Sequence, residues 1–145
     1  MGKVVRLAAA FGALMLATPV SAQGVVNIYC SVQAEWCTSI ANEFQKATGI
    51  KASISQKGSG ETIAQLKAEA QNPKGDVWFG GTGDPHLQAA EENLTEVYKS
   101  PRLSELHPWA VKQNADSGGK TVGIYAGALG FGFNTELLAK KGAKA

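Results

Sequence analysis

The chain has 145 residues, of which 44% are hydrophobic and 18% are charged, with 14 Lys and Arg against 12 Asp and Glu. This length predicts one domain, and the hydrophobic share is typical of a folded globular protein rather than a disordered one. The formal net charge of +2 is spread along the chain without a basic patch, so no nucleic-acid partner is expected.

Residues 1–22 have the pattern of a secretory signal peptide. Lys3 and Arg6 give a positive start, residues 7–17 are apolar, and small residues precede a cleavage site that we place after Ala22. An apolar run of about 11 residues is shorter than the roughly 20 that span a bilayer, so the mature chain is not expected to insert into a membrane. We therefore predict export of the mature chain.

Cys30 and Cys37 are the only cysteines, and an oxidising compartment would permit one disulfide between them. The intervening residues run from a predicted strand into a predicted helix, which could hold the two Cα atoms beyond the limit of about 7 Å. Two buried thiols are the alternative, and the sequence leaves both open. The spacing differs from C-x-x-C, so a thiol oxidoreductase is not expected.

The mature chain begins with a predicted strand and helix. Residues 25–30 are rich in β-branched and aromatic side chains and predict a strand. Apolar side chains then recur at helical spacing at Trp36, Ile40 and Phe44, and Gly49 supplies the stop.

A second strand and helix follow. Residues 50–55 alternate between apolar and polar side chains and predict a strand. The small-residue loop 57–60 opens a helix that residues 72–75 end. The apolar stripe of that helix consists of Ile63, Leu66 and Ala70.

Residues 76–79 are short and almost wholly apolar, as expected of a buried parallel strand. A glycine-rich loop follows at 80–83, and Asp84 with Pro85 gives a helix start signal. The inner face of that helix is predicted to consist of Leu87, Ala90 and Leu94. After a polar stretch from 95 to 119, residues 120–126 predict a further strand, and residues 134–141 predict a helix.

Alternating strands and helices imply an α/β fold, in which helices cover both faces of a parallel sheet in three layers. Ligands of such sheets lie beyond the carboxyl ends of the strands, where the strand order reverses. This rule selects the loops 31–34, 57–61 and 80–84 as the candidate site.

The loop at 57–62 combines glycines, a hydroxyl and a cation at a predicted helix N-terminus. Unpaired N–H groups and the positive end of the helix dipole favour a phosphate, a carboxylate or a similar anion there. The alternative is that Ser59 only caps the helix, helped by Glu61 or Thr62. The Walker spacing G-x-x-x-x-G-K-[ST] is absent.

The loop at 80–83 permits close approach of a ligand, but it lacks the G-x-G-x-x-G pattern of dinucleotide sites. Asp84 is expected to cap its helix, and His86 stands close enough to reach a ligand. The sequence contains no nucleophile elbow, no H-E-x-x-H motif and no zinc-type cysteine and histidine spacing. We therefore expect a binding protein that is not an enzyme and needs no cofactor.

Several segments resemble the periplasmic substrate-binding proteins of ABC importers, in the ferric-iron-binding-like subgroup of the type II fold. The resemblance covers the mature chain and is carried by residues 26–31, 44–51, 59–62, 72–78, 80–86 and 127–135. It implies two α/β lobes that close over a ligand, of which residues 23–145 would be the N-terminal lobe. The second lobe would be missing, because the chain is either a fragment or the product of a truncated gene.

The resemblance implies a small-molecule or ion ligand, a permease in the inner membrane as partner, and a monomer. Iron binders of this group commonly place a histidine and a glutamate where this chain has Gln33 and Gly81, neither of which suits Fe³⁺. An anionic organic solute such as an organophosphate, a phosphonate or a carboxylate fits the residues better. A non-transport sensor lobe or an inactive remnant is the remaining alternative. The candidate ligand-binding residues are Ser31, Gln33, Lys57, Ser59, Gly60, Gly81, Thr82 and Tyr125.

Overall fold

The computed structural model describes residues 24–128 and 130–142. The predicted signal peptide, residues 1–22, lies outside this part of the chain and stays a prediction. Among the described helices, none is both long and apolar enough to cross a membrane.

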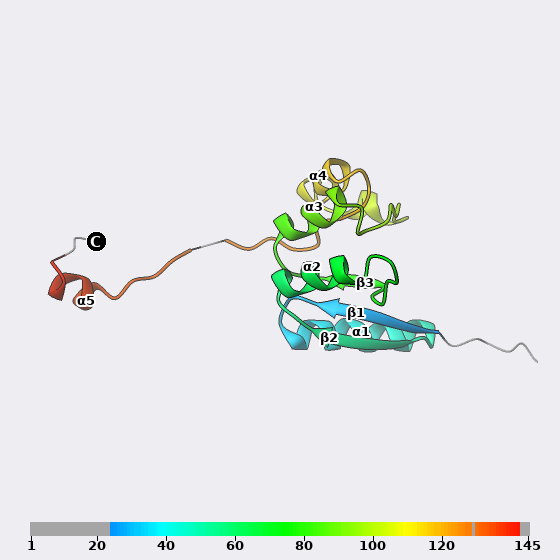
Figure 1. The fold of residues 1–145 in the computed structure, drawn as a ribbon, viewed down its shortest axis with the longest axis horizontal. Coiled ribbons are helices and arrows are strands. Elements are labelled where there is room, and N and C mark those ends of the chain that lie inside the picture. The colour runs from blue at the N-terminus through cyan, green and yellow to red at the C-terminus, as the bar shows by residue number, and fades with distance from the viewer. Residues whose placement is uncertain (1–23, 129, 143–145) are drawn as a thin grey trace, which may run out of the picture.

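Three parallel strands form the sheet, in the order β2-β1-β3 (Figure 1). They are β1 (Val25–Cys30), β2 (Lys51–Gln56) and β3 (Val77–Phe79), which confirms the predicted α/β class and three of the predicted strands. The sequence runs from β1 to β2 on one side and then crosses to β3 on the other, so the strand order reverses at β1.

The register of the sheet makes the strands end at the same level. Cys30 lies opposite Gln56 in β2 and opposite Phe79 in β3. The next residues continue the ladder, because Ser31 N donates to the Phe79 carbonyl and Lys57 N to the Cys30 carbonyl, each at 2.9 Å. The loops that follow all three strands therefore begin at one edge of the sheet.

Helices cover both faces of the sheet. α1 (Ala34–Thr48) lies on the opposite side from α2 (Ser59–Ala68), with α3 (Gly83–Glu91) next to α2 (Figure 1). α1 ends at Gly49, whose φ of 73° is the left-handed conformation expected of a glycine helix stop. The second helix is shorter than predicted. It ends at Ala68, before residues 72–75, which were expected to end it.

Two features of the polar stretch and its continuation differ from prediction. Residues 95–119, predicted only as a polar stretch, contain a 3-10 turn (Leu103–Glu105) and a helix, α4 (Pro108–Asp116). The predicted strand 120–126 is wrong, since this segment pairs with no strand in the described chain. Its backbone is instead held by side chains of the α4 region, as when Asn114 donates to the Thr121 carbonyl at 2.8 Å.

The described residues after 126 lie away from the sheet and include α5 (Thr135–Lys140), as Figure 1 shows. This confirms the predicted helix at 134–141. Asn134 caps it, accepting a hydrogen bond from Leu137 N at 2.9 Å.

The core lies around the carboxyl half of β1. Tyr29 is almost fully buried there, and its phenol donates to Glu69 at 2.7 Å while it accepts from Gln65 at 3.0 Å. Burial and the adjacent Glu69 carboxylate raise the pKa of the Tyr29 phenol to about 12. Gly75 packs on this ring, where a β-carbon would lie only 2.5 Å from a Tyr29 ring atom.

Cys30 and Cys37 form a disulfide between the end of β1 and the first turn of α1. Their Cα atoms lie 6.3 Å apart, because α1 begins at Ala34 and turns Cys37 back toward the strand. The bridge closes around residues 31–36, the loop nearest the predicted site. Of the two alternatives that the sequence left open, the structure has the disulfide.

His86 joins α3 to the sheet. Its ring stacks on Trp78 of β3, with centroids 3.8 Å apart, and its Nε2 lies 2.8 Å from the Gly80 carbonyl. A carbonyl only accepts, so Nε2 carries the proton. Burial lowers the pKa of the His86 imidazole, although the hydrogen bond to Gly80 acts in the opposite direction.

Removing the disulfide should destabilise the fold. With a sequence separation of 7, the loop-closure entropy of the unfolded chain corresponds to roughly 2–3 kcal/mol of unfolding free energy. We expect the free energy of unfolding of the exported chain, measured by urea titration, to fall by that amount when reductant is added. The midpoint of the transition should move to a lower urea concentration. The double variant Cys30→Ala/Cys37→Ala, which has no bridge to lose, is the control and should not respond to reductant. An unchanged midpoint in the reduced wild-type chain would contradict the prediction.

Acidification should also destabilise the fold through His86. Because its folded-state pKa lies below the unfolded value of about 6.5, the neutral ring contributes stability that is complete above pH 6.5 and is lost as the pH falls below it. We expect the free energy of unfolding to decrease between pH 7 and 5.5, and His86→Phe to reduce that slope. His107→Gln, which removes an exposed imidazole, is the matched control. A wild-type slope in His86→Phe would show that another group is responsible.

Candidate ligand-binding site

A broad open cavity of about 1120 Å³ lies beyond the carboxyl ends of the strands. Its walls come from the loops after β1, β2 and β3 and from the segment at 125–128, which reaches the same edge. These are the three loops that the strand order predicted. The residues that line the cavity are Ser31, Val32, Gln33, Trp36, Gln56, Lys57, Gly58, Ser59, Glu61, Gly81, Thr82, Gly83, Tyr125, Ala126, Gly127 and Ala128.

Three helices point their N-termini at this cavity. α1, α2 and α3 follow β1, β2 and β3 directly, and their N-cap residues are Gln33, Gly58 and Thr82. All three caps line the cavity, and none of them makes a side-chain capping bond to its own helix. Each N-terminus carries a partial positive charge of about half an elementary charge, so their fields add within the cavity.

The first turn of α2 leaves its donors open. Gly58 is the N-cap, and its N–H donates to the Glu61 carboxylate at 3.0 Å. Ser59 is therefore the first helical residue, so the alternative that it caps the helix is wrong. Within the described chain, no protein group hydrogen-bonds the Ser59 hydroxyl or the N–H groups of Ser59 and Gly60. These donors are available to an anion.

Lys57 supplies the single positive charge among the residues that line the cavity. It is half-buried between the end of β2 and the start of α2, and no carboxylate of the described residues forms an ion pair with it. Glu61 is the one acidic residue of the lining, and its carboxylate accepts the Gly58 N–H.

Ser31 forms part of the floor of the cavity, and the hydroxyl of the fully buried Thr62 lies beneath it. Trp78 Nε1 donates to Ser31 Oγ at 2.8 Å, and Ser31 Oγ lies 3.1 Å from Thr62 Oγ1. Thr62 donates its own proton to the Gly58 carbonyl at 3.0 Å, so the Ser31 proton must point to Thr62. Ser31 thus retains a lone pair, which suits a hydroxyl donor of a solute rather than an anionic oxygen.

Tyr125 closes one side of the cavity by binding the loop after β3. Its hydroxyl accepts from Gly81 N at 2.9 Å and donates to the Gly81 carbonyl at 3.0 Å. Gly81 has a φ of 94°, and a β-carbon there would press against Ser59 and Ser31. A glycine is therefore required both for the backbone conformation and for the close approach of the three loops.

The structure brings nearly all of the predicted ligand residues to this cavity. Gly60 is the exception, since it lies in the first turn of α2 but not in the lining. Asp84 does not cap α3 as predicted, because Thr82 is the N-cap. Sequence reasoning used Trp36 only as part of a helical apolar pattern and missed it as a site residue, although its side chain is 48% exposed and lines the cavity. A tryptophan in the first turn after a site loop was the available signal.

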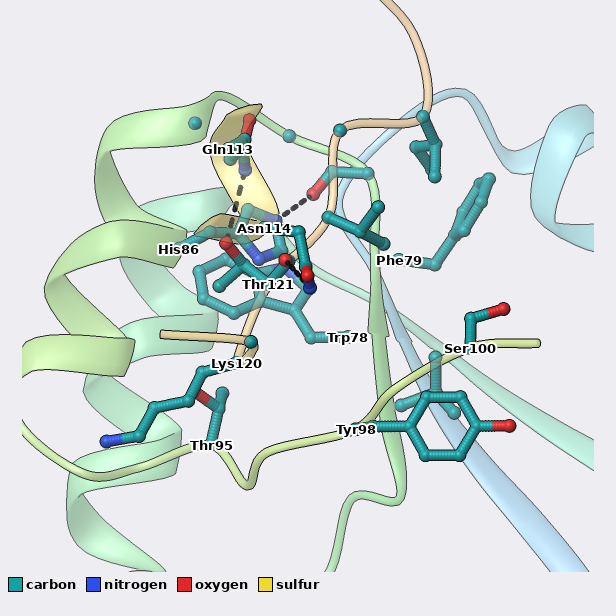
Figure 2. Close-up of a pocket in the computed structure, with 18 of the residues that line it drawn as sticks. Trp78, Phe79, His86, Thr95, Tyr98, Ser100, Gln113, Asn114, Lys120 and Thr121 are labelled. Carbon is teal, nitrogen blue, oxygen red and sulfur yellow. Dashed lines mark hydrogen bonds between the residues drawn. The ribbon is translucent and has the colours of Figure 1, made fainter. Parts of the chain in front are cut away.

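A second cavity, of about 370 Å³, lies between β3 and the segment at 119–125. Figure 2 shows His86 and Trp78 side by side in it, with Tyr98 and Phe79 farther along the wall. Lys120 lines it too, but its ammonium group is bound by the Ala90 carbonyl and Asn93. With a largely apolar wall and its cation already bound, this cavity suits an ionic ligand less well than the first.

Within the described residues, no group of three or more His, Cys, Asp and Glu side chains is placed to hold a metal ion. His86, which the sequence placed within reach of a ligand, uses Nε2 on the Gly80 carbonyl. No ligand role is assigned to it.

Known proteins match most of the chain. The family described as bacterial extracellular solute-binding protein matches residues 26–126. An uncharacterised protein of Haemophilus influenzae is 43% identical over 124 residues, which are 86% of this chain and 36% of that protein. The chain thus spans little more than a third of the length of this relative.

Solved structures agree with the family match. The periplasmic binding protein P5PA is 41% identical with a TM-score of 0.73, covering 84% of this chain and 39% of P5PA. The periplasmic binding protein AfuA of Actinobacillus pleuropneumoniae, solved with fructose 6-phosphate bound, is 38% identical with a TM-score of 0.71, covering 85% of this chain and 39% of AfuA.

Iron-bound HitA of Pseudomonas aeruginosa is more distant, at 24% identity and a TM-score of 0.56 over 59% of this chain and 28% of HitA, and shows a shared fold alone. Together with the parallel sheet and the family match over residues 26–126, these likenesses identify the fold as that of type II periplasmic binding proteins. The chain belongs to the bacterial extracellular solute-binding proteins.

Proposed function

We propose that this protein captures a phosphorylated organic solute in the periplasm and that the phosphate group binds at the N-terminus of α2. The open first turn of α2 carries this proposal, because the Ser59 hydroxyl and the Ser59 and Gly60 N–H groups have no partner in the described chain. Lys57 stands beside them as a full positive charge on the same cavity. Helix N-termini with free donors are well suited to phosphate.

The relatives support an organic phosphate more than iron. AfuA, which shares 38% identity, was solved with fructose 6-phosphate bound, whereas iron-bound HitA shares only the fold. The geometry agrees, since three helix N-termini that attract an anion would repel a trivalent cation. Gln33 and Gly81, which stand where iron binders of this group commonly have a histidine and a glutamate, both line the cavity.

The family match supports a role in transport. We infer that the exported protein delivers its solute to an ABC permease of the inner membrane, acts as a monomer and performs no catalysis. The solved relatives are longer, since the chain covers 39% of P5PA and of AfuA. In a two-lobed protein, the open cavity would be completed by a second lobe that closes by a hinge motion.

Ser59→Asp should weaken phosphate binding without unfolding the protein. A carboxylate in the first turn suits the helix dipole, so α2 should remain intact, while its negative charge would stand where the phosphate binds. We expect fructose 6-phosphate to bind at least about tenfold more weakly, as measured by calorimetry or by amide chemical shifts in an NMR titration.

Ser104→Asp is the matched control, because it adds the same charge in the exposed 3-10 turn away from the cavity. It should bind fructose 6-phosphate like the wild-type chain. Equal affinity in Ser59→Asp and wild type would refute the phosphate position at α2. Binding of ferric citrate without binding of fructose 6-phosphate or inorganic phosphate would refute the solute class.

A further inference from the structure

Two aromatic side chains, Trp36 and Tyr125, form an aromatic wall in the same cavity as the phosphate position. Trp36, in the first turn of α1, meets Tyr125 edge to face, with ring centroids 5.6 Å apart and planes inclined by 84°. Both residues line the cavity, with 48% of Trp36 and 37% of Tyr125 exposed. Two large aromatic side chains are thus partly exposed in a cavity whose proposed phosphate position, at the N-terminus of α2, is polar.

This wall is fixed from two sides. Tyr125 is held by its two hydrogen bonds to the Gly81 backbone, which set the position of its ring. The backbone of Trp36 is anchored next to the bridged Cys37, because its main-chain N–H donates to the Gln33 carbonyl at 3.0 Å, and its ring packs against that of Tyr125. A preformed apolar surface loses less conformational entropy when it binds than a mobile one would.

Inorganic phosphate has no apolar face that could pack on this aromatic wall. The helix N–H groups and Lys57 are enough to bind its charged oxygens. Small-molecule sites typically combine an apolar wall with a few polar groups that fix orientation. Here the polar groups gather at α2 and the apolar surface at α1 and Tyr125, while the free lone pair of Ser31 lies in the floor between β1 and α2.

We propose that Trp36 and Tyr125 form a subsite that packs on the flat carbon face of the solute while its phosphate lies at α2. This inference rests on the proposed function and narrows it to phosphate monoesters with a flat apolar face, such as a sugar ring or a heteroaromatic ring. Trp36 then decides specificity, because it binds the part of the solute that inorganic phosphate lacks.

The test compares two probes on the exported chain, fructose 6-phosphate and inorganic phosphate, by NMR titration. For the wild type, we expect both to shift the amide signals of Ser59 and Gly60, and only fructose 6-phosphate to shift the Trp36 indole signal. Trp36→Ala should weaken fructose 6-phosphate by about tenfold and leave inorganic phosphate within twofold of wild type. Trp36→Phe, which keeps an aromatic face, should recover most of the loss.

Phe131→Ala is the matched control, because it removes an aromatic side chain that is 92% exposed and lies outside the cavity. It should change neither affinity. If both probes bind at α2 but Trp36→Ala leaves their affinity ratio unchanged, the aromatic subsite is refuted and the phosphate site stands. If neither probe moves the α2 signals, the proposed function itself is wrong. Folding of each variant is checked from the dispersion of the same spectra.

Discussion

The site depends on the register of three short parallel strands. Because Cys30 lies opposite both Gln56 and Phe79, the three strands end at the same level. Each strand is therefore followed by a loop at the same edge of the sheet. Asp76 secures the other end of β3, accepting the Asn27 N–H at 2.8 Å while its own N–H donates to the Asn27 carbonyl at 2.9 Å. A slip of one residue would reverse the side chains of β3 and move its loop away from the others.

Below the cavity, one hydrogen-bonded path joins elements that are distant in sequence. It runs from Trp78 through Ser31 and Thr62 to Gly58, and so links β3 to the loop after β1 and then to the cap of α2. Thr62 is fully buried, so its hydroxyl needs the two partners that it has on this path. These hydrogen bonds therefore set the loop positions, while the Ser59 hydroxyl has no partner in the described chain and remains free to bind.

Local patterns in the sequence predicted much of this arrangement, and the exceptions have physical causes. The strands β1, β2 and β3 follow from runs of apolar or alternating residues, and the loops beyond their ends mark the cavity. Residues 120–126 also have a strand pattern, but a strand requires an edge to pair with, and this segment lies across a cavity from β3. The sequence of α4 has little apolar periodicity, because Ala110 is its one buried residue. Pro108 at its start was the only local indication of a helix.

Properties that depend on tertiary placement were beyond the reach of a sequence pattern. The state of Cys30 and Cys37 was decided by where α1 begins, which local spacing defines only to within a residue or two. The pairing of Trp36 with Tyr125 joins residues far apart in the chain, so periodicity around Trp36 indicated only a helix face. Spacing located the polar side of the site, and only the fold revealed its aromatic side.

Charge in this site comes mainly from the backbone. The chain as a whole is nearly neutral, and Lys57 is the sole cation of the cavity wall. Lys57 and Glu61 carry opposite charges in the lining, so their net contribution is close to zero. Three helix N-termini with about half a charge each leave a net positive charge of roughly 1.5 elementary charges, which is close in size to the charge of about −1.5 to −2 on a phosphate monoester. Such a field is built into the fold and needs no side chain to reorganise when the anion arrives. The orientation of the helices therefore favours the anion, and the aromatic wall is left to distinguish one phosphate ester from another.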